Sequence, residues 1–240
     1  MTGVVEYLSG RAYPGRGILL GKTKDGAYAV AAYFIMGRSA NSRNRIFEQQ
    51  ADGSVCTRPF DAAKVKDPSL ILYMPVRTVK DTLIVTNGDQ TDTIADALLH
   101  GGTFRCALLT RTYEPDSPNF TPRISGMLRI KAGEPDYTLS ILRKKAEGMD
   151  CDRSFFHYEA PRSGECHIIH TYLEGGDPLE SFAGDPVQAE LPEGDIDAFT
   201  SALWASLNAD NRISLLIRFL PLDGGEAVTR IRNKYTEGKE

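Results

Sequence analysis

Short apolar runs separated by turn residues dominate the pattern along the chain. Runs rich in β-branched and aromatic residues are typical of β-strands. The longest run, residues 27–36, contains only apolar and aromatic side chains, which predicts a strand buried on both faces. Further strands are predicted over residues 17–20, 69–74, 82–86, 103–113, 123–131, 137–144, 154–159, 165–173, 212–220 and 227–232.

Two segments carry the periodicity of amphipathic helices instead. Residues 91–100 place their apolar side chains on one face, and Gly101 and Gly102 follow as a stop signal. Residues 195–207 repeat apolar positions at helical spacing and begin at Asp195, a favoured N-cap residue. We therefore predict two helices and about ten strands, a balance that favours an α+β protein of layered sheets covered by helices.

The chain shows no clear boundary between domains. Residues 175–192 are rich in Gly, Pro and acidic residues and predict a long loop. No stretch resembles a flexible linker, and no repeat of solenoid length is present. We expect one domain over residues 1–240.

Composition narrows the class of protein. The 28 Lys and Arg against 32 Asp and Glu give a net charge of −4, and 41% of residues are hydrophobic. This balance argues against a disordered chain and against a dedicated nucleic-acid binder. No run reaches the ~18 apolar residues of a membrane span, and no secretory signal is apparent. We expect a cytoplasmic protein that binds neither membranes nor nucleic acid.

The cysteines and histidines raise the question of a metal. Cys166, His167 and His170 lie close together, with Cys151 and His157 upstream. A zinc site needs nitrogen and sulfur ligands that converge on a tetrahedron. On a strand, positions 167 and 170 point to opposite faces, so we predict no metal site here. The four cysteines show no C-x-x-C spacing and are expected to be reduced thiols.

Standard catalytic motifs are missing. The sequence has no phosphate-binding loop of the G-x-x-x-x-G-K-[ST] type, no complete dinucleotide fingerprint and no H-E-x-x-H or G-x-S-x-G motif. We therefore expect no cofactor.

Removal of Met1 would expose Thr2 as an N-terminal nucleophile. Thr2 lies well ahead of the first predicted strand, which is unfavourable because a nucleophile belongs on a rigid element.

An arginine-rich segment carries the strongest chemical signal. Arg38, Arg43 and Arg45 directly follow the buried strand over residues 27–36, with Ser and Asn between them. Arginine forks bind phosphate and carboxylate oxygens bidentately, and loops at strand ends often carry ligand contacts. The alternative is a solvated basic loop.

Two further polar segments follow along the chain. Residues 86–92 predict a strand, a tight turn and a helix start, which offers either contacts to a nucleotide or simple capping by Asp89, Thr91 or Asp92. Two carboxylates would repel a phosphate, so we favour capping.

In residues 113–124, Glu114 and Arg123 flank a polar loop, either as a structural ion pair or as part of a pocket with Glu114 as base or substrate anchor.

Taken in order, several stretches resemble the archaeal-type IMP cyclohydrolase family. The resemblance runs from residue 13 to about residue 128, is weaker in the second half, and leaves residues 1–12 as an extension ahead of the family's usual start. The matching stretches are Tyr13 to Arg16, Leu19 to Thr23, Ala32 and Tyr33, Arg38 and Ser39 with Arg43, Thr82 to Gly88 with Thr91 and Asp92, Tyr113 and Glu114, and Thr121 to Ile124.

The resemblance implies a fold and a reaction. The family is similar in fold to the N-terminal nucleophile hydrolases, a four-layer αββα sandwich with mostly antiparallel sheets. Its reaction closes 5-formamidoimidazole-4-carboxamide ribotide to IMP with loss of water, without a cofactor, in de novo purine biosynthesis. The ligand is thus a purine ribonucleotide, and the resemblance also implies a homo-oligomer. A non-catalytic purine-nucleotide-binding protein and an amide hydrolase using Thr2 remain as alternatives.

Site residues follow from the same resemblance. Arg38 would bind the phosphate or polarise the carboxamide, and Glu114 would orient the amide or accept its proton. The phenol of Tyr73 would protonate the departing hydroxyl, unless that ring simply packs in the core. The remaining substrate-binding candidates are Arg43, Asn87, Thr121 and Arg123.

Overall fold

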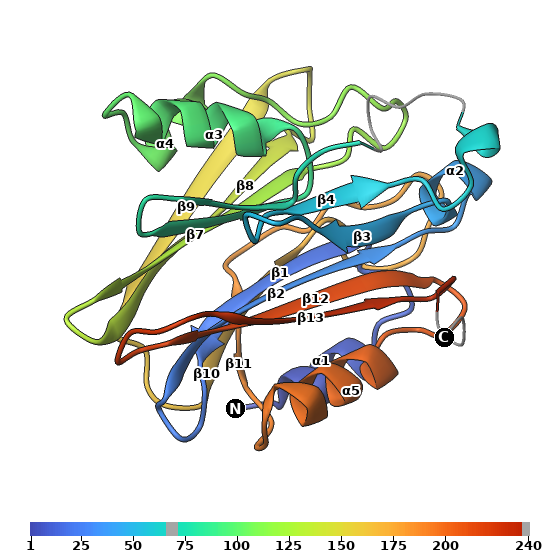
Figure 1. The fold of residues 1–240 in the computed structure, drawn as a ribbon. Helices are drawn as coiled ribbons and strands as arrows, with labels where there is room; N and C mark the ends of the chain where they lie inside the picture. The colour runs from blue at the N-terminus through green and yellow to red at the C-terminus, as the bar shows by residue number, and fades with distance from the viewer. Residues whose placement is uncertain (66–71, 237–240) are drawn as a thin grey trace.

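Two antiparallel sheets lie face to face, with helices on both outer sides (Figure 1). The computed structural model describes residues 1–65 and 72–236. The first sheet has the order β11-β10-β1-β2-β12-β13 and the second the order β3-β4-β5-β6-β7-β8-β9. Helices α3 and α4 cover the second sheet, and α1 and α5 cover the first (Figure 1).

The bounds of the elements are as follows. The first sheet contains β1 (Arg16–Lys22), β2 (Tyr28–Met36), β10 (Glu165–His170), β11 (Val187–Glu190), β12 (Arg212–Pro221) and β13 (Val228–Asn233). The second contains β3 (Ile46–Gln49), β4 (Val55–Arg58), β5 (Val76–Val79), β6 (Thr82–Thr86), β7 (Arg123–Lys131), β8 (Glu134–Lys144) and β9 (Cys151–Glu159). The helices are α1 (Val4–Ser9), α2 (Ala40–Arg43), α3 (Gln90–Leu99), α4 (Phe104–Leu109) and α5 (Ile196–Ser206), with a 3₁₀ turn at Ala62–Lys64.

The core has three layers, and the side chains of β2 contribute alternately to two of them. Ala31 and Tyr33 point between the two sheets, whereas Ala32 and Phe34 point toward α1 and α5. A third cluster packs α3 and α4 against the second sheet. Because successive side chains of a strand point to opposite faces, this central strand has no polar face. The prediction of a strand buried on both sides is confirmed.

Most predicted elements are present, but three predictions are wrong. Residues 103–113 form helix α4, not a strand: Thr103 caps the helix by accepting a hydrogen bond from the Cys106 amide, and Phe104, Ala107 and Leu108 give it a buried face. The predicted loop 175–192 contains strand β11, which pairs with β10. Of the predicted strand 69–74, residues 69–71 lie outside the described residues, and 72–74 are not in a strand.

Several short elements could not be predicted from the hydrophobic pattern of the sequence. Helix α1 has six residues and begins after Gly3, and β3, β4 and β5 have four residues each. Segments this short owe their structure to sheet pairing and packing rather than to local propensity. The two helices that were predicted, α3 and α5, are the longest ones described.

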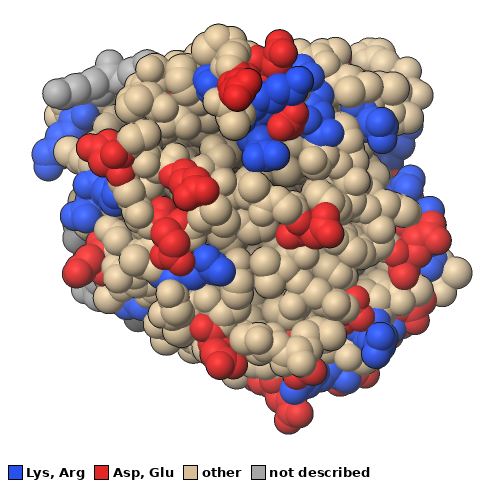
Figure 2. Space-filling view, turned by 180° about the vertical axis from the view of Figure 1, so that it is seen from behind, with Lys and Arg blue, Asp and Glu red and all other residues tan. Residues whose placement is uncertain are grey.

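Charged side chains are intermixed on the surface. On the face opposite to that of Figure 1, Lys and Arg gather near the top beside Asp and Glu, and much of the centre is uncharged (Figure 2). None of the described helices is long and apolar enough to cross a membrane. All four cysteines are free thiols, as predicted.

Candidate active site

A buried ion pair lies at the centre of the candidate site. The Arg16 guanidinium donates to both carboxylate oxygens of Glu114, at 3.1 Å and 2.9 Å, and to the backbone carbonyl of Asn87 at 3.1 Å. Arg16 is 9% exposed and Glu114 is 3% exposed. Arg16 opens β1, so the strand carries the guanidinium to the end of the first sheet, next to the loop that follows α4. Such bidentate pairs are strong and geometrically specific.

The loop that carries Glu114 is closed by its own hydrogen bonds. The Glu114 amide donates to the carbonyl of Thr121 at 2.9 Å, and the Thr121 amide donates to the Asp116 carboxylate at 2.6 Å. The Thr121 hydroxyl also contacts that carboxylate, and it lies 2.5 Å from the hydroxyl of Tyr172. The loop therefore connects the second sheet to the end of β10, where Tyr172 follows.

A cavity of about 270 Å³ opens over this ion pair. Its size lies near the lower end of small-molecule sites. Arginines, hydroxyls, amides and two carboxylates line it together with two tyrosine rings. The described lining residues are Tyr13, Gly15, Arg16, Met36, Arg38, Ser39, Asn41, Ser42, Arg45, Glu114, Asp116, Asn119, Thr121, Tyr172 and Leu179.

Electrostatics keep this centre charged. Burial alone would lower the pKa of the Arg16 guanidinium, but Glu114 and neighbouring phenols hold that pKa well above its usual value. The Tyr33 and Tyr73 hydroxyls lie 2.7 Å apart, and burial together with Tyr73 raises the pKa of Tyr33. The cavity therefore has a permanent cation at its floor, with two buried phenols close by.

The structure brings three of the candidate site residues, Arg38, Glu114 and Thr121, together at this cavity. Arg45 of the arginine-rich segment lines it as well. Arg38 is exposed: its guanidinium lies 4.8 Å from the centre of the Tyr13 ring and donates to the carbonyl of Gly176. Arg45 is buried and donates from Nε to the carbonyl of Ser42. Two further cations thus line the wall above the Arg16 floor.

The other candidates contact protein groups rather than the cavity. The Arg43 Nε donates to the carbonyl of Gly37, and Tyr73 lies beneath the site against Tyr33. Asn87 is fully buried, with its amide bonded to Pro122 and its side-chain oxygen accepting from the Ile124 amide. None of the three is among the described residues that line the cavity.

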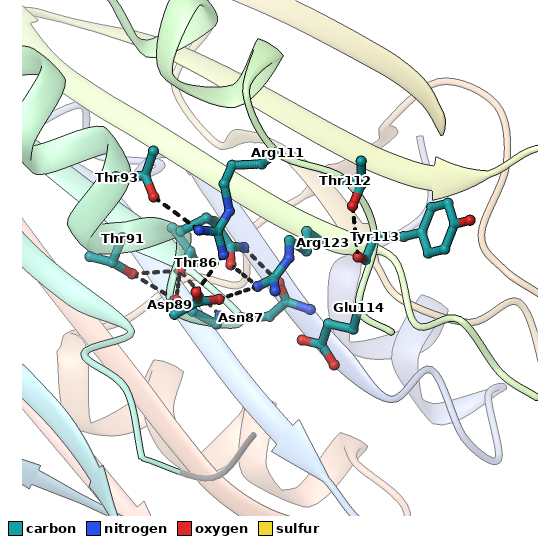
Figure 3. Close-up of polar contacts among 12 residues, drawn as sticks. Thr86, Asn87, Asp89, Thr91, Thr93, Arg111, Thr112, Tyr113, Glu114 and Arg123 are labelled. Carbon is teal, nitrogen blue, oxygen red and sulfur yellow. Dashed lines mark hydrogen bonds and ion pairs between the residues drawn. The ribbon is translucent and has the colours of Figure 1, made fainter. Parts of the chain in front are cut away.

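Arg123 belongs to a separate cluster at the start of α3. It donates to Asp89 at 2.5 Å and to Gln90 at 2.8 Å, and Arg111 contacts the same Asp89 carboxylate (Figure 3). Of the three capping candidates Asp89, Thr91 and Asp92, it is Asp89 that occupies the N-cap position of α3. Its carboxylate makes no capping hydrogen bond, because it is paired with Arg123 and Arg111. Glu114 stands beside this cluster, and no hydrogen bond or ion pair joins it to the other residues drawn (Figure 3).

The histidine positions agree with the strand geometry that argued against a metal. The His167 ring contacts Tyr137 between the sheets, whereas His170 contacts Tyr7 of α1 on the other face. A different group, Asp136 with His157 and Glu159, brings three potential ligand atoms within 4.8 Å of one another. Asp136 already forms an ion pair with Lys131, so a metal would have to compete with an existing cation.

Thr2 does not belong to the cavity. It is exposed, and its carbonyl accepts a hydrogen bond from the amide of Glu190, the last residue of β11. Among the described residues, the cavity lining contains no part of the first twelve residues. The alternative of an amide hydrolase using Thr2 therefore has no support from the geometry of this cavity.

Sequence reasoning missed Arg16, Tyr13 and Tyr172 as functional residues. Arg16 carried one available signal, a charge directly before the apolar run Gly17–Gly21. Such a residue is expensive to bury unless it has a partner, which in itself indicates a buried ion pair. Tyr172 gave no such signal, because it follows β10 of the first sheet and contacts Thr121, 51 positions away, just ahead of β7 of the second sheet.

Fold and site together define an α+β protein of two stacked antiparallel sheets with an arginine-lined cavity over a buried ion pair. The family model described as IMP cyclohydrolase-like protein matches residues 13–224. The chain belongs to this family.

Individual relatives agree with that assignment. The IMP cyclohydrolase of Methanopyrus kandleri is 34% identical over 192 residues, which cover 73% of this chain and 87% of the relative. That of Methanococcus maripaludis strain C6 is 34% identical over 187 residues, covering 75% and 91%. The Methanosphaera stadtmanae enzyme is 36% identical over 123 residues, covering 50% and 59%.

Proposed function

We propose that this protein is an IMP cyclohydrolase that closes 5-formamidoimidazole-4-carboxamide ribotide to IMP with loss of water. The observation that carries the proposal is the Arg16–Glu114 pair at the floor of an arginine-lined cavity, in a chain of this family. In the reaction, the carboxamide nitrogen bonds to the formyl carbon and gives up one proton. The formamide nitrogen gives up its own proton as the new C=N bond forms, and the formyl oxygen leaves with these two protons as water. Holding both groups of the imidazole in one conformation supplies much of the catalysis.

Arg16 is suited to stabilise the oxygen that gains negative charge during ring closure. A guanidinium has five N–H donors, and three are used in bonds to Glu114 and Asn87. The two that remain belong to a fixed cation lining a cavity, which is the arrangement needed for electrostatic catalysis.

Glu114 acts through Arg16 in this proposal rather than as the base. Both of its oxygens accept hydrogen bonds from the guanidinium, so the carboxylate is used to hold Arg16 in place. Tyr73 remains the candidate for the proton donor to the departing hydroxyl, because its phenol bonds Tyr33 next to Arg16. That step requires the proton to pass from the buried phenols toward the cavity.

Arg38 and Arg45 are assigned to the 5′-phosphate. Both line the cavity wall, and arginine is the side chain best matched to phosphate geometry. Thr121 lines the same cavity and is kept as a substrate-binding residue. Three further residues are assigned a structural role, because each holds a loop that borders the cavity: Arg43, Asn87 and Arg123.

The wider architecture is part of the proposal. We infer that the two-sheet arrangement with helices outside is the αββα fold of N-terminal nucleophile hydrolases. We also propose a single domain over residues 1–240, a cytoplasmic location, a cofactor-independent reaction and a homo-oligomeric assembly. The family match over residues 13–224 supports the single domain.

The decisive experiment is an ultraviolet assay of the purified protein with the formamido nucleotide, with and without a chelator. We expect chelator-resistant formation of IMP that collapses in Arg38→Ala. The matched control is Arg58→Ala, which removes an exposed arginine paired with Glu48 outside the cavity lining. Absence of turnover with a melting temperature raised by IMP would identify a binding protein instead. Loss of activity in a Thr2 variant, without dependence on Arg38, would support the amide hydrolase.

A further inference from the structure

Tyr172 occupies a wall of the cavity that no motif assigns. Its ring stacks on Tyr13 at 6.0 Å between centroids, with planes 16° apart. Gly15, at φ +78°, lets the ring approach the backbone, because a Cβ there would lie 2.6 Å from a Tyr172 ring carbon. The ring is 5% exposed, and its hydroxyl lies 2.5 Å from that of Thr121.

The direction of the hydrogen bonds at this hydroxyl can be deduced. The Asp116 carboxylate only accepts, so the Thr121 hydroxyl gives its single hydrogen to Asp116. Thr121 must then accept from Tyr172, whose hydroxyl hydrogen is thereby used. What Tyr172 still offers to the cavity is the lone pairs of its oxygen. Burial raises the pKa of this phenol to about 12, so it stays protonated at neutral pH and the deduced pattern is maintained.

Hydrogen bonds hold the backbone of Tyr172 at both its amide and its carbonyl. Its amide donates to the carbonyl of Pro14, and its carbonyl lies 2.7 Å from Nδ1 of His170. A carbonyl only accepts, so Nδ1 carries the hydrogen and Nε2 of His170 is an acceptor. The Tyr7 hydroxyl, 2.6 Å away, donates to that nitrogen.

Tyr7 belongs to the segment that precedes the family match. Residues 1–12 lie ahead of the matched residues 13–224, and α1 is anchored there by the fully buried Val4 and Leu8. The described cavity lining contains no residue of this segment, but Tyr7 reaches the cavity wall through its contact with His170. The edge of Phe182 also packs on the His170 ring and limits its rotation.

We propose that the Tyr172 hydroxyl is a further substrate-contacting group, accepting an N–H or O–H of the nucleotide, and that Tyr7 and His170 are positioning residues that hold it. The inference rests on the proposed function and deepens it. Carboxamide, formamide and ribose groups all present donors, and both oxygens of Glu114 are already bonded to Arg16. An additional neutral acceptor on the wall therefore has a specific use: it selects the orientation of a donor-bearing substrate.

The test is a double-variant cycle of Tyr7→Phe and Tyr172→Phe, with KM for the formamido nucleotide, kcat, and Kd for IMP as readouts. Loss of one neutral hydrogen bond predicts that Tyr172→Phe raises KM and Kd about 3- to 10-fold, with kcat nearly unchanged. Tyr7→Phe is expected to raise both about 2- to 5-fold. Because Tyr7 acts through Tyr172, the double variant should raise KM by less than the product of the single effects.

Tyr28→Phe serves as the matched control, because it removes a hydroxyl of the first sheet outside the cavity lining. Melting temperatures establish that each variant is folded at the assay temperature. Wild-type KM and Kd in folded Tyr172→Phe would overturn the proposal while leaving the cyclohydrolase function intact. A multiplicative effect in the double variant would overturn the positioning role of Tyr7. A wild-type protein that neither cyclises the nucleotide nor binds IMP would overturn both proposals.

Discussion

Replacing Glu114 by Gln tests the central ion pair with the least change in shape. The amide retains one acceptor for Arg16 but removes the counter-charge from a guanidinium that is 9% exposed. Removing one partner of a buried pair costs about 3–5 kcal/mol, because the remaining charge stays buried without compensation. A domain of this size loses about 2–4 °C of melting temperature per kcal/mol, so we expect a drop of roughly 6–20 °C.

The assay compares scanning calorimetry with cyclisation kinetics for three proteins. These are the wild type, Glu114→Gln and the double variant Arg16→Met with Glu114→Leu. Replacing both charges by apolar groups of similar size is often neutral for stability, so the double variant should regain most of the lost melting temperature. It should remain inactive, because the cation proposed to stabilise the developing oxyanion is gone. A wild-type melting temperature in Glu114→Gln, or activity in the double variant, would refute the reasoning.

Three further outcomes follow from the same contacts. Arg38→Ala should lower kcat/KM about 10- to 100-fold and leave the melting temperature within about 2 °C, because the side chain is exposed and single packing contacts at the surface contribute little. Arg123→Met should do the opposite, losing about 1–3 kcal/mol of stability through Asp89 and Gln90 with KM unchanged; a large rise in KM at constant stability would return Arg123 to the substrate site. Burial lowers the pKa of His170 to about 4 from 6.5, so the unfolded chain binds more protons between these values. Stability should therefore fall by about 3 kcal/mol as pH drops through this window, and His170→Asn should flatten that dependence in pH-dependent unfolding curves.

Long, strongly patterned elements were predictable from their own residues. The apolar run of β2 and the amphipathic helix α5 carry their burial in the sequence, and both appear where the pattern places them. The segment at 103–113 shows the limit of that approach. Its apolar residues suit a strand or a helix, and the capping bond from the Cys106 amide to Thr103 is what favours the helix.

The candidate site, too, was predictable from the sequence only in part. Arginines in a loop after a buried strand predicted a polar cavity, and Arg38 does line one. The same reasoning placed Asn87 and Arg123 with the substrate, although their side chains are used in bonds to neighbouring protein groups. Residue type alone does not distinguish these cases, because a donor that binds a ligand and a donor that holds a loop have the same chemistry.

The sequence by itself determined that this chain would fold as layered sheets with few helices, and its motifs identified the family. Both follow from local periodicity and short co-linear stretches, which need no knowledge of distant contacts. Tertiary structure alone decided that Arg16 would meet Glu114 across 98 positions, and that Tyr7 would reach His170 across 163. Partners this far apart are set by sheet pairing and by the packing of α1, and the free energy of burying their charges and hydroxyls appears only once both are in place.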